Sequence, residues 1–210
     1  AQYFPGAETA DEATGHPWQQ LRGDRFTLET LDPADASHLP ELGRALAQAQ
    51  ARSGLAPTAP FTVRAFPSTP AFRDGTLAPG WVAAFAEGNW IGAQPPRTLA
   101  ARRLLGPVLR HEFLHALVEQ QAGPQAPLWL REGLVEFWSA DAPAAGPAPS
   151  LGLDQLDRAL AHPETEAASA AAHLAAAWYA GRLLTRFGRE QTLAWLRSGL
   201  PASAVATLRP

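Results

Sequence analysis

The sequence predicts an α+β fold, because strand patterns fill its first half and helical patterns fill its second half. Up to Gln94, short runs of β-branched and aromatic residues alternate with segments rich in Pro and Gly, as is typical of strands and turns. From Arg97 onward, apolar residues recur at the spacing of three and four that is typical of helices. We therefore expect one domain, 26–210, with a β-rich part at 26–96 and a helical part at 97–210.

The first half of the chain supplies the expected strands. Residues 1–25 are polar and carry several Pro and Gly, so we expect a poorly structured leader with Trp18 and Leu21 docked on the body. Strands are predicted at 26–31, 61–66, 81–86 and 90–94, and the last two form a hairpin around Glu87-Gly88-Asn89. A helix is expected from about 37 to 52, ended by Gly54, and a loop at 67–80.

The second half supplies the expected helices, which are separated by Gly and Pro. Gly106-Pro107 and Gly123-Pro124 bound one helix, and an Ala-, Pro- and Gly-rich loop covers 141–150. The predicted helices are 98–105, 107–121, 128–138, 152–161, 166–187 and 189–198.

Composition narrows the class of protein. The net charge is −3 and no basic run stands out, which argues against a nucleic-acid partner. Cys is absent, which excludes disulfides, thiolate metal sites and Cys nucleophiles. No apolar run approaches the length of a membrane span. The chain begins with Ala1 rather than Met, so we expect a processed, extracytoplasmic protein. Nothing in the sequence indicates an oligomeric state.

One motif organises the helical half. His111-Glu112-Phe113-Leu114-His115 reads H-E-x-x-H, and on a helix its two His lie one turn apart on one face. Both imidazoles then reach a single Zn²⁺ ion. Glu112 lies beside that face, where a carboxylate acts as general base toward a zinc-activated water.

A catalytic zinc site needs one more protein ligand and leaves one position for water. The next helix with acidic residues supplies Glu132, 17 positions after His115. Glu136 lies one turn beyond Glu132 on the same face, and we expect it to accept a hydrogen bond from a ligating His. The small Gly133 is expected to allow close approach of the H-E-x-x-H helix.

These residues resemble a known family. His111-Glu112-x-x-His115 followed by Trp129-Leu130-Arg131-Glu132-Gly133 is similar to the gluzincin metallopeptidases, and most similar to the group called peptidase MA-like. The resemblance is strongest over 104–138, and Trp178–Gly188 and the strands of 61–94 extend it. It implies that His111, His115 and Glu132 bind one Zn²⁺ per chain, and that Glu112 is the general base.

The resemblance also implies a fold and a substrate. We expect a zincin-like (gluzincin) fold, in which a small mixed sheet lies beside the active-site helix and a helical C-terminal subdomain follows. An edge strand, either 82–86 or 90–94, would pair with an extended peptide or protein substrate. Tyr179 is the expected oxyanion donor, with His173 as the alternative and Arg182 as a further candidate. The chain has no G-x-M-E-N-type segment to capture a substrate amino terminus, so we expect an endopeptidase.

Two other functions fit the same sequence. The first is a binding or scaffold module that keeps the zincin fold without turnover. The second is a zinc amidase acting on a cell-wall linkage. Against the scaffold function, every catalytic element of the motif is present, including Glu112.

Overall fold

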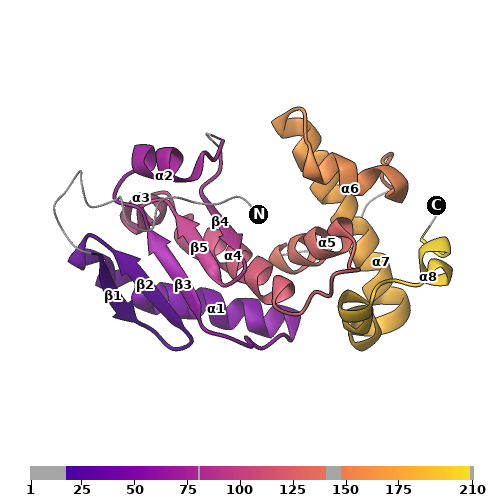
Figure 1. Cartoon of the computed structure of the whole chain (residues 1–210), viewed down its shortest axis with the longest axis horizontal. Helices are drawn as coiled ribbons and strands as arrows, with labels where there is room; N and C mark the ends of the chain where they lie inside the picture. Colours follow the sequence, from indigo (N-terminus) through magenta and orange to yellow (C-terminus); the bar gives the residue numbers. More distant parts are fainter. Residues whose placement is uncertain (1–17, 80, 141–147, 209–210) are drawn as a thin grey trace. The chain divides into compact units, whose positions relative to one another are not determined.

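The computed structural model describes residues 18–79, 81–140 and 148–208 (Figure 1). Within it the chain forms two compact units, Ala1–Ala116 and Leu117–Pro210. All strands of the described chain precede Pro95, and every later element is a helix. This distribution confirms the α+β class predicted from the sequence.

The first unit is built on a five-stranded mixed sheet of order β1-β2-β3-β5-β4. Strands β2, β3 and β5 run parallel, and β1 and β4 pair antiparallel at the two edges. The predicted hairpin is confirmed; Glu87 pairs with Trp90, so its turn consists of the two residues Gly88-Asn89, with Gly88 at φ 58°. The strands are β1 (Gln19–Arg22), β2 (Phe26–Thr30), β3 (Phe61–Ala65), β4 (Ala84–Glu87) and β5 (Trp90–Ala93).

Helices connect and cover the strands of this unit. The predicted first helix is confirmed as α1, which ends at Gly54 in the left-handed conformation (φ 72°). The elements are a 3₁₀ helix, η1 (Pro33–His38), and the helices α1 (Leu39–Ser53), α2 (Thr69–Thr76), α3 (Pro96–Ala101) and α4 (Leu105–Glu119).

One face of the sheet forms the core of the first unit. Alternate residues of the parallel strands are buried, including Phe26 and Leu28 of β2, and Phe61 and Val63 of β3. Phe113 of α4 packs its ring against Phe26 and Phe61, with centroids 6.2 and 5.5 Å apart. The helix that carries H-E-x-x-H is therefore held on the sheet by the residue at the centre of its motif.

Two expectations for the first unit are corrected. Gln19–Arg22, inside the expected leader, forms strand β1, with Leu21 opposite Leu28. The backbone of β2 supplies its pairing, so β1 needs no apolar alternation of its own; residues 1–17 lie outside the described chain. The expected loop at 67–80 contains α2, because Ser68 caps Ala71 and Phe72 is fully buried.

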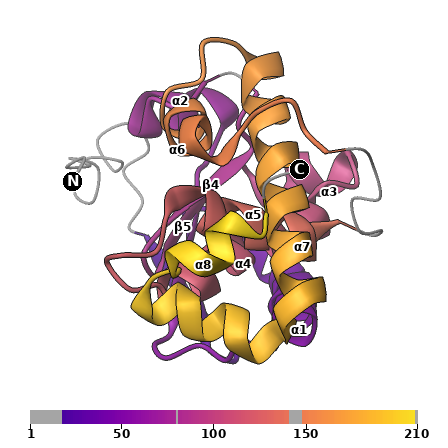
Figure 2. The same cartoon turned by 90° about the vertical axis from the view of Figure 1, so that its right-hand side faces the viewer.

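The second unit is helical (Figure 2). Its long helix breaks at Gly188, where φ is 79°, so the predicted pair of helices meets there at a sharp angle. No helix in the described part of the chain has the length and apolar character of a membrane span. The elements are α5 (Leu128–Ser139), α6 (Leu153–Ala161), α7 (Glu166–Ser198) and α8 (Ala202–Ala206).

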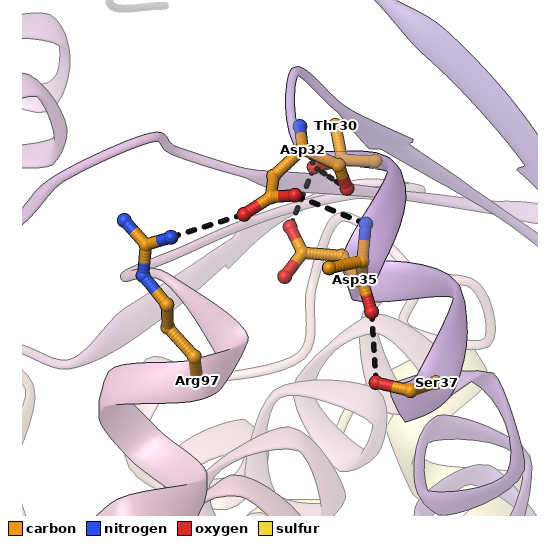
Figure 3. A network of polar contacts seen from close by, with 6 residues as sticks. Thr30, Asp32, Asp35, Ser37 and Arg97 are labelled. Carbon is orange, nitrogen blue, oxygen red and sulfur yellow. Dashed lines mark hydrogen bonds and ion pairs between the residues drawn. The ribbon is translucent and has the colours of Figure 1, made fainter.

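A polar network follows the end of β2 in the first unit (Figure 3). Thr30 accepts from the backbone N–H of Asp32 (3.0 Å) and donates its hydroxyl to Asp35 (2.5 Å). Asp32 caps η1 through Ala34 and pairs with Arg97 at 3.0 Å. Asp35 is only 6% exposed, and burial raises the pKa of its carboxyl above the usual 3.8.

The raised pKa of Asp35 predicts that the stability of the folded state depends on pH. The folded state holds the Asp35 proton more tightly than the unfolded state, so the free energy of unfolding falls as pH rises from 3.8 through the raised pKa. Asp35→Asn removes this loss, so the variant should be more stable than wild type at neutral pH. This gain in stability should vanish below pH 3.8, where Asp35 of the wild type is protonated in both the folded and the unfolded state.

Hydrogen exchange of the amides of β2 and β3, measured at acidic and neutral pH, reports the stability of this unit. Asp74→Asn, at an exposed acid of α2, is the matched control. A variant whose gain is the same at both pH values would contradict the assignment of the loss to Asp35 ionisation.

Candidate metal site and catalytic residues

The His pair occupies one face of α4. His111 and His115 are one turn apart and half-buried, and their Nε2 atoms lie 3.1 Å from each other. Phe113, two positions from each His, points to the opposite side of the helix, into the sheet. The burial of Phe113 therefore fixes the direction in which the two imidazoles point.

The distance between the two nitrogens tests whether the pair suits zinc. Two nitrogens at about 2.0–2.1 Å from one ion and 3.1 Å from each other enclose an angle of about 100°, close to the tetrahedral value. Each ring presents the same nitrogen, Nε2, toward the shared position. This separation fits two positions of a zinc ion.

Glu112 lies in a pocket of the first unit. It is 7% exposed and lines a hollow of about 250 Å³ together with His111. The rest of the lining comes from the first turns of α4 and from the beginning of β4: Pro107, Val108, Ala83 and Ala84. An acid and an imidazole of the motif thus share a pocket with the edge of the sheet.

The edge strand is β4 rather than β5. Of the two predicted strands, β5 lies inside the sheet between β3 and β4, while β4 is outermost. Its neighbour in the described chain is β5, and its other side points away from the sheet. An outer strand presents N–H and C=O groups to which an extended peptide can pair.

Gln94 anchors the beginning of that strand, a role that the sequence analysis missed. Its side-chain N–H donates to the Val82 carbonyl (2.9 Å), and its carbonyl accepts from the Thr69 hydroxyl (3.1 Å). Its backbone N–H donates to the Ala83 carbonyl (3.0 Å). A buried amide directly after an apolar strand was the available signal, because such a group needs partners.

Glu132 belongs to the second unit, where it faces α7. Its carboxylate lies 3.5 Å from Nε2 of His173, and Nδ1 of His173 donates to the Ser169 carbonyl at 2.8 Å. The Glu132 carboxylate raises the pKa of His173 to about 9, so the imidazole is cationic at neutral pH. The negative charge of Glu136, one turn further along α5, adds to this effect.

Tyr179 and Arg182 are engaged within the same unit. The Tyr179 hydroxyl is buried and donates to the Leu151 carbonyl at 3.2 Å, and the ring packs against Trp129. Burial also raises the pKa of Tyr179. Arg182 stacks on Trp178 at 4.9 Å. Tyr179 could donate to an oxyanion only if its hydrogen bond to Leu151 broke. Nε2 of His173 faces the Glu132 carboxylate instead.

Close packing of α5 on α7 sets the position of Glu132. A Cβ at Gly133 would collide with the Ala176 carbonyl oxygen of α7 and lie 3.0 Å from Cβ of Ala180. The backbone N–H of Trp129, at the start of α5, donates to Asp157 of α6 at 2.7 Å. The close approach that Gly133 allows is thus to α7, and the close approach to the H-E-x-x-H helix predicted from the sequence is corrected.

In the part of the chain that the structure describes, no group of three or more His, Asp or Glu is gathered in a metal-binding arrangement. The His pair lies in the first unit and Glu132 in the second. No protein-family model matches the chain, and no curated protein matches it either. The case for a metal site therefore rests on the motif, the geometry of the His pair and the pocket beside it.

The packing of α5 on α7 makes a prediction about Gly133. Gly133→Ala forces the two helices apart, and overpacking of this kind costs about 1–3 kcal/mol of stability. Gly43→Ala is the matched control, because no atom lies within 4 Å of a Cβ placed there in α1. Ala in a helix interior is favoured over Gly by about 1 kcal/mol, so the control should be more stable than wild type.

Urea unfolding followed by circular dichroism measures both variants. If Gly133→Ala were as stable as Gly43→Ala, the close approach of α5 to the Ala176 carbonyl would be wrong.

Proposed function

We propose that the chain is a zinc-dependent metallopeptidase of the gluzincin type that cleaves peptide bonds within an extended substrate. His111, His115 and Glu132 would hold one zinc ion. The observation that carries the proposal is the 3.1 Å approach of the two imidazole nitrogens beside a pocket shared by Glu112 and the edge strand β4.

The chemistry divides between the metal and the chain. Zinc, when bound, would lower the pKa of a water molecule toward about 7 and would polarise the scissile carbonyl. Glu112 takes the proton of the attacking water and passes it to the leaving amine.

The substrate would bind along β4. Backbone pairing to an outer strand holds a peptide extended without regard to its side chains, which suits cleavage within a chain. Gln94 would keep the beginning of β4 beside His111 and Glu112 through its bond to Val82. Tyr179, or His173 as the alternative, would donate a hydrogen bond to the tetrahedral oxyanion.

Glu112→Gln should separate catalysis from metal binding. The amide keeps the size of the side chain and removes the base, so zinc should remain while hydrolysis falls by roughly 10²–10⁴-fold. Cleavage of a mixed peptide library, read by mass spectrometry, measures the loss beside zinc analysis of the same samples. Glu190→Gln, at an exposed acid of α7, is the control and should leave both unchanged.

Two results would redirect the proposal. Full turnover by Glu112→Gln would remove the general base from the mechanism. A zinc-loaded wild-type chain that cleaves no peptide in the library would favour the binding or scaffold function, or the amidase acting on a cell-wall linkage.

Glu132 and Glu136 should respond differently to truncation. Glu132→Ala removes a ligand and should abolish stoichiometric zinc, as should His111→Ala. Glu136→Ala removes a carboxylate that orients the site, so zinc affinity should fall by roughly 10–100-fold. Titration against a chromogenic chelator measures both. A greater loss in Glu136→Ala than in Glu132→Ala would mean that the two roles are exchanged.

A further inference from the structure

A second pocket of the first unit lies where three parallel strands end. Leu31 and Asp32 follow β2, Phe66 and Pro67 follow β3, and Pro95 follows β5. All five line a cavity of about 150 Å³, together with Asp35 and Arg97. In open sheets with parallel strands, ligands bind in crevices outside the carboxyl ends of those strands.

Asp35 is the buried polar group of this pocket. Asp35 lines the cavity although it is only 6% exposed. Within the described chain, the Thr30 hydroxyl is the sole hydrogen-bond donor to its carboxylate, whereas a carboxylate offers about four acceptor positions. Burial and the nearby Asp32 carboxylate raise the pKa of Asp35, while the Thr30 hydrogen bond and the charges of His38 and Arg97 lower it.

The other two charged residues of the pocket largely compensate each other. Arg97 Nη1 lies 3.0 Å from Asp32 at the exposed rim, where the Arg97 side chain is 66% exposed. The second oxygen of Asp32 accepts from the Ala34 N–H, so both of its oxygens are engaged (Figure 3). Two carboxylates stand against one guanidinium, and the net charge of −1 falls on Asp35.

We propose that this pocket binds a primary ammonium group carried on a short apolar chain. The ammonium supplies the positive charge and the donors that Asp35 lacks, and the apolar chain lies against Leu31, Phe66 and the two prolines. A cavity of about 150 Å³ holds a ligand as large as benzene, or about six non-hydrogen atoms. A butylammonium group is of this size.

Two sources offer this chemistry. One is a free alkylamine, and the other is the lysine side chain of a peptide, which ends in the same four carbons and ammonium. This chain contains no Lys, so the lysine would come from another molecule. The inference is independent of the proposed peptidase activity, because none of the pocket residues belongs to the H-E-x-x-H motif.

Titration of the full chain with butylammonium chloride tests the proposal, with chemical shifts as the readout. At mildly alkaline pH the amine is still protonated, since its pKa is near that of Lys. We expect saturable shifts at Thr30, Asp35 and Phe66, with a dissociation constant on the order of 1 mM for so small a ligand. n-Butanol has the same length without the charge and should bind at least 10-fold more weakly.

Variants show whether the carboxylate and the cavity are responsible. Asp35→Asn should weaken butylammonium binding at least 10-fold, while Asp74→Asn should bind like wild type. Leu31→Trp fills the cavity and leaves Asp35 in place, so it should also abolish binding. Absence of saturable binding to wild type, equal binding of butanol, or unchanged binding by Asp35→Asn would each overturn the proposal.

A last arm identifies the source of the amine. Nα-acetyl-lysine methylamide presents the lysine side chain between two peptide groups. Displacement of butylammonium by this compound at lower concentration supports a lysine of a peptide as the ligand, and weaker displacement supports a free amine. Displacement is measured with a labelled alkylamine as the bound probe. If neither butylammonium nor Nα-acetyl-lysine methylamide displaced it, the labelled amine would bind elsewhere and the proposed site would be wrong.

Discussion

The first unit depends on the burial of Phe113 against Phe26 and Phe61. Because Phe113 is the central residue of the H-E-x-x-H motif, this aromatic contact fixes the rotation of α4 about its axis. The two imidazoles then project from the opposite side, with their Nε2 atoms 3.1 Å apart. Glu112, about a quarter of a turn from His111, enters the pocket beside β4. One packing contact therefore sets the directions of Glu112 and of both imidazoles.

In the second unit, small residues set the position of a charged pair. Gly133 and the Ala residues of α7 let two helix backbones approach closely, and Glu132 beside Gly133 meets His173 across that contact. The pair carries opposite charges, because the carboxylate raises the pKa of His173 to about 9. A bulky residue at 133 would separate the helices and with them the two charged groups. Close packing thus positions a polar pair that the flexible side chains alone would not hold.

The sheet of the first unit places two pockets at the same end of its strands. The antiparallel β4 begins where the parallel β5 ends, since Ala84 pairs with Ala93. Gln94, directly after β5, binds the chain just before β4, and Pro95 lines the pocket that holds Asp35. A polar or charged group placed after a strand is positioned by the whole sheet rather than by a flexible loop. This explains why these two pockets lie at strand ends.

The sequence by itself determined the α+β class, the hairpin at Gly88, the helix break at Gly188 and the placing of two His on one helix face, because each follows from local periodicity or from a glycine conformation. It did not reveal β1 or α2, since the first is held by pairing to β2 and the second by a Ser cap and one buried Phe. The zinc ligands and the peptidase activity remain predictions from the motif. Only the tertiary structure decided that β4 rather than β5 is the edge strand, that Gly133 faces α7, and that Asp35 is buried. Strand order, helix contacts and burial depend on residues far apart in the chain, and a local pattern carries no information about them.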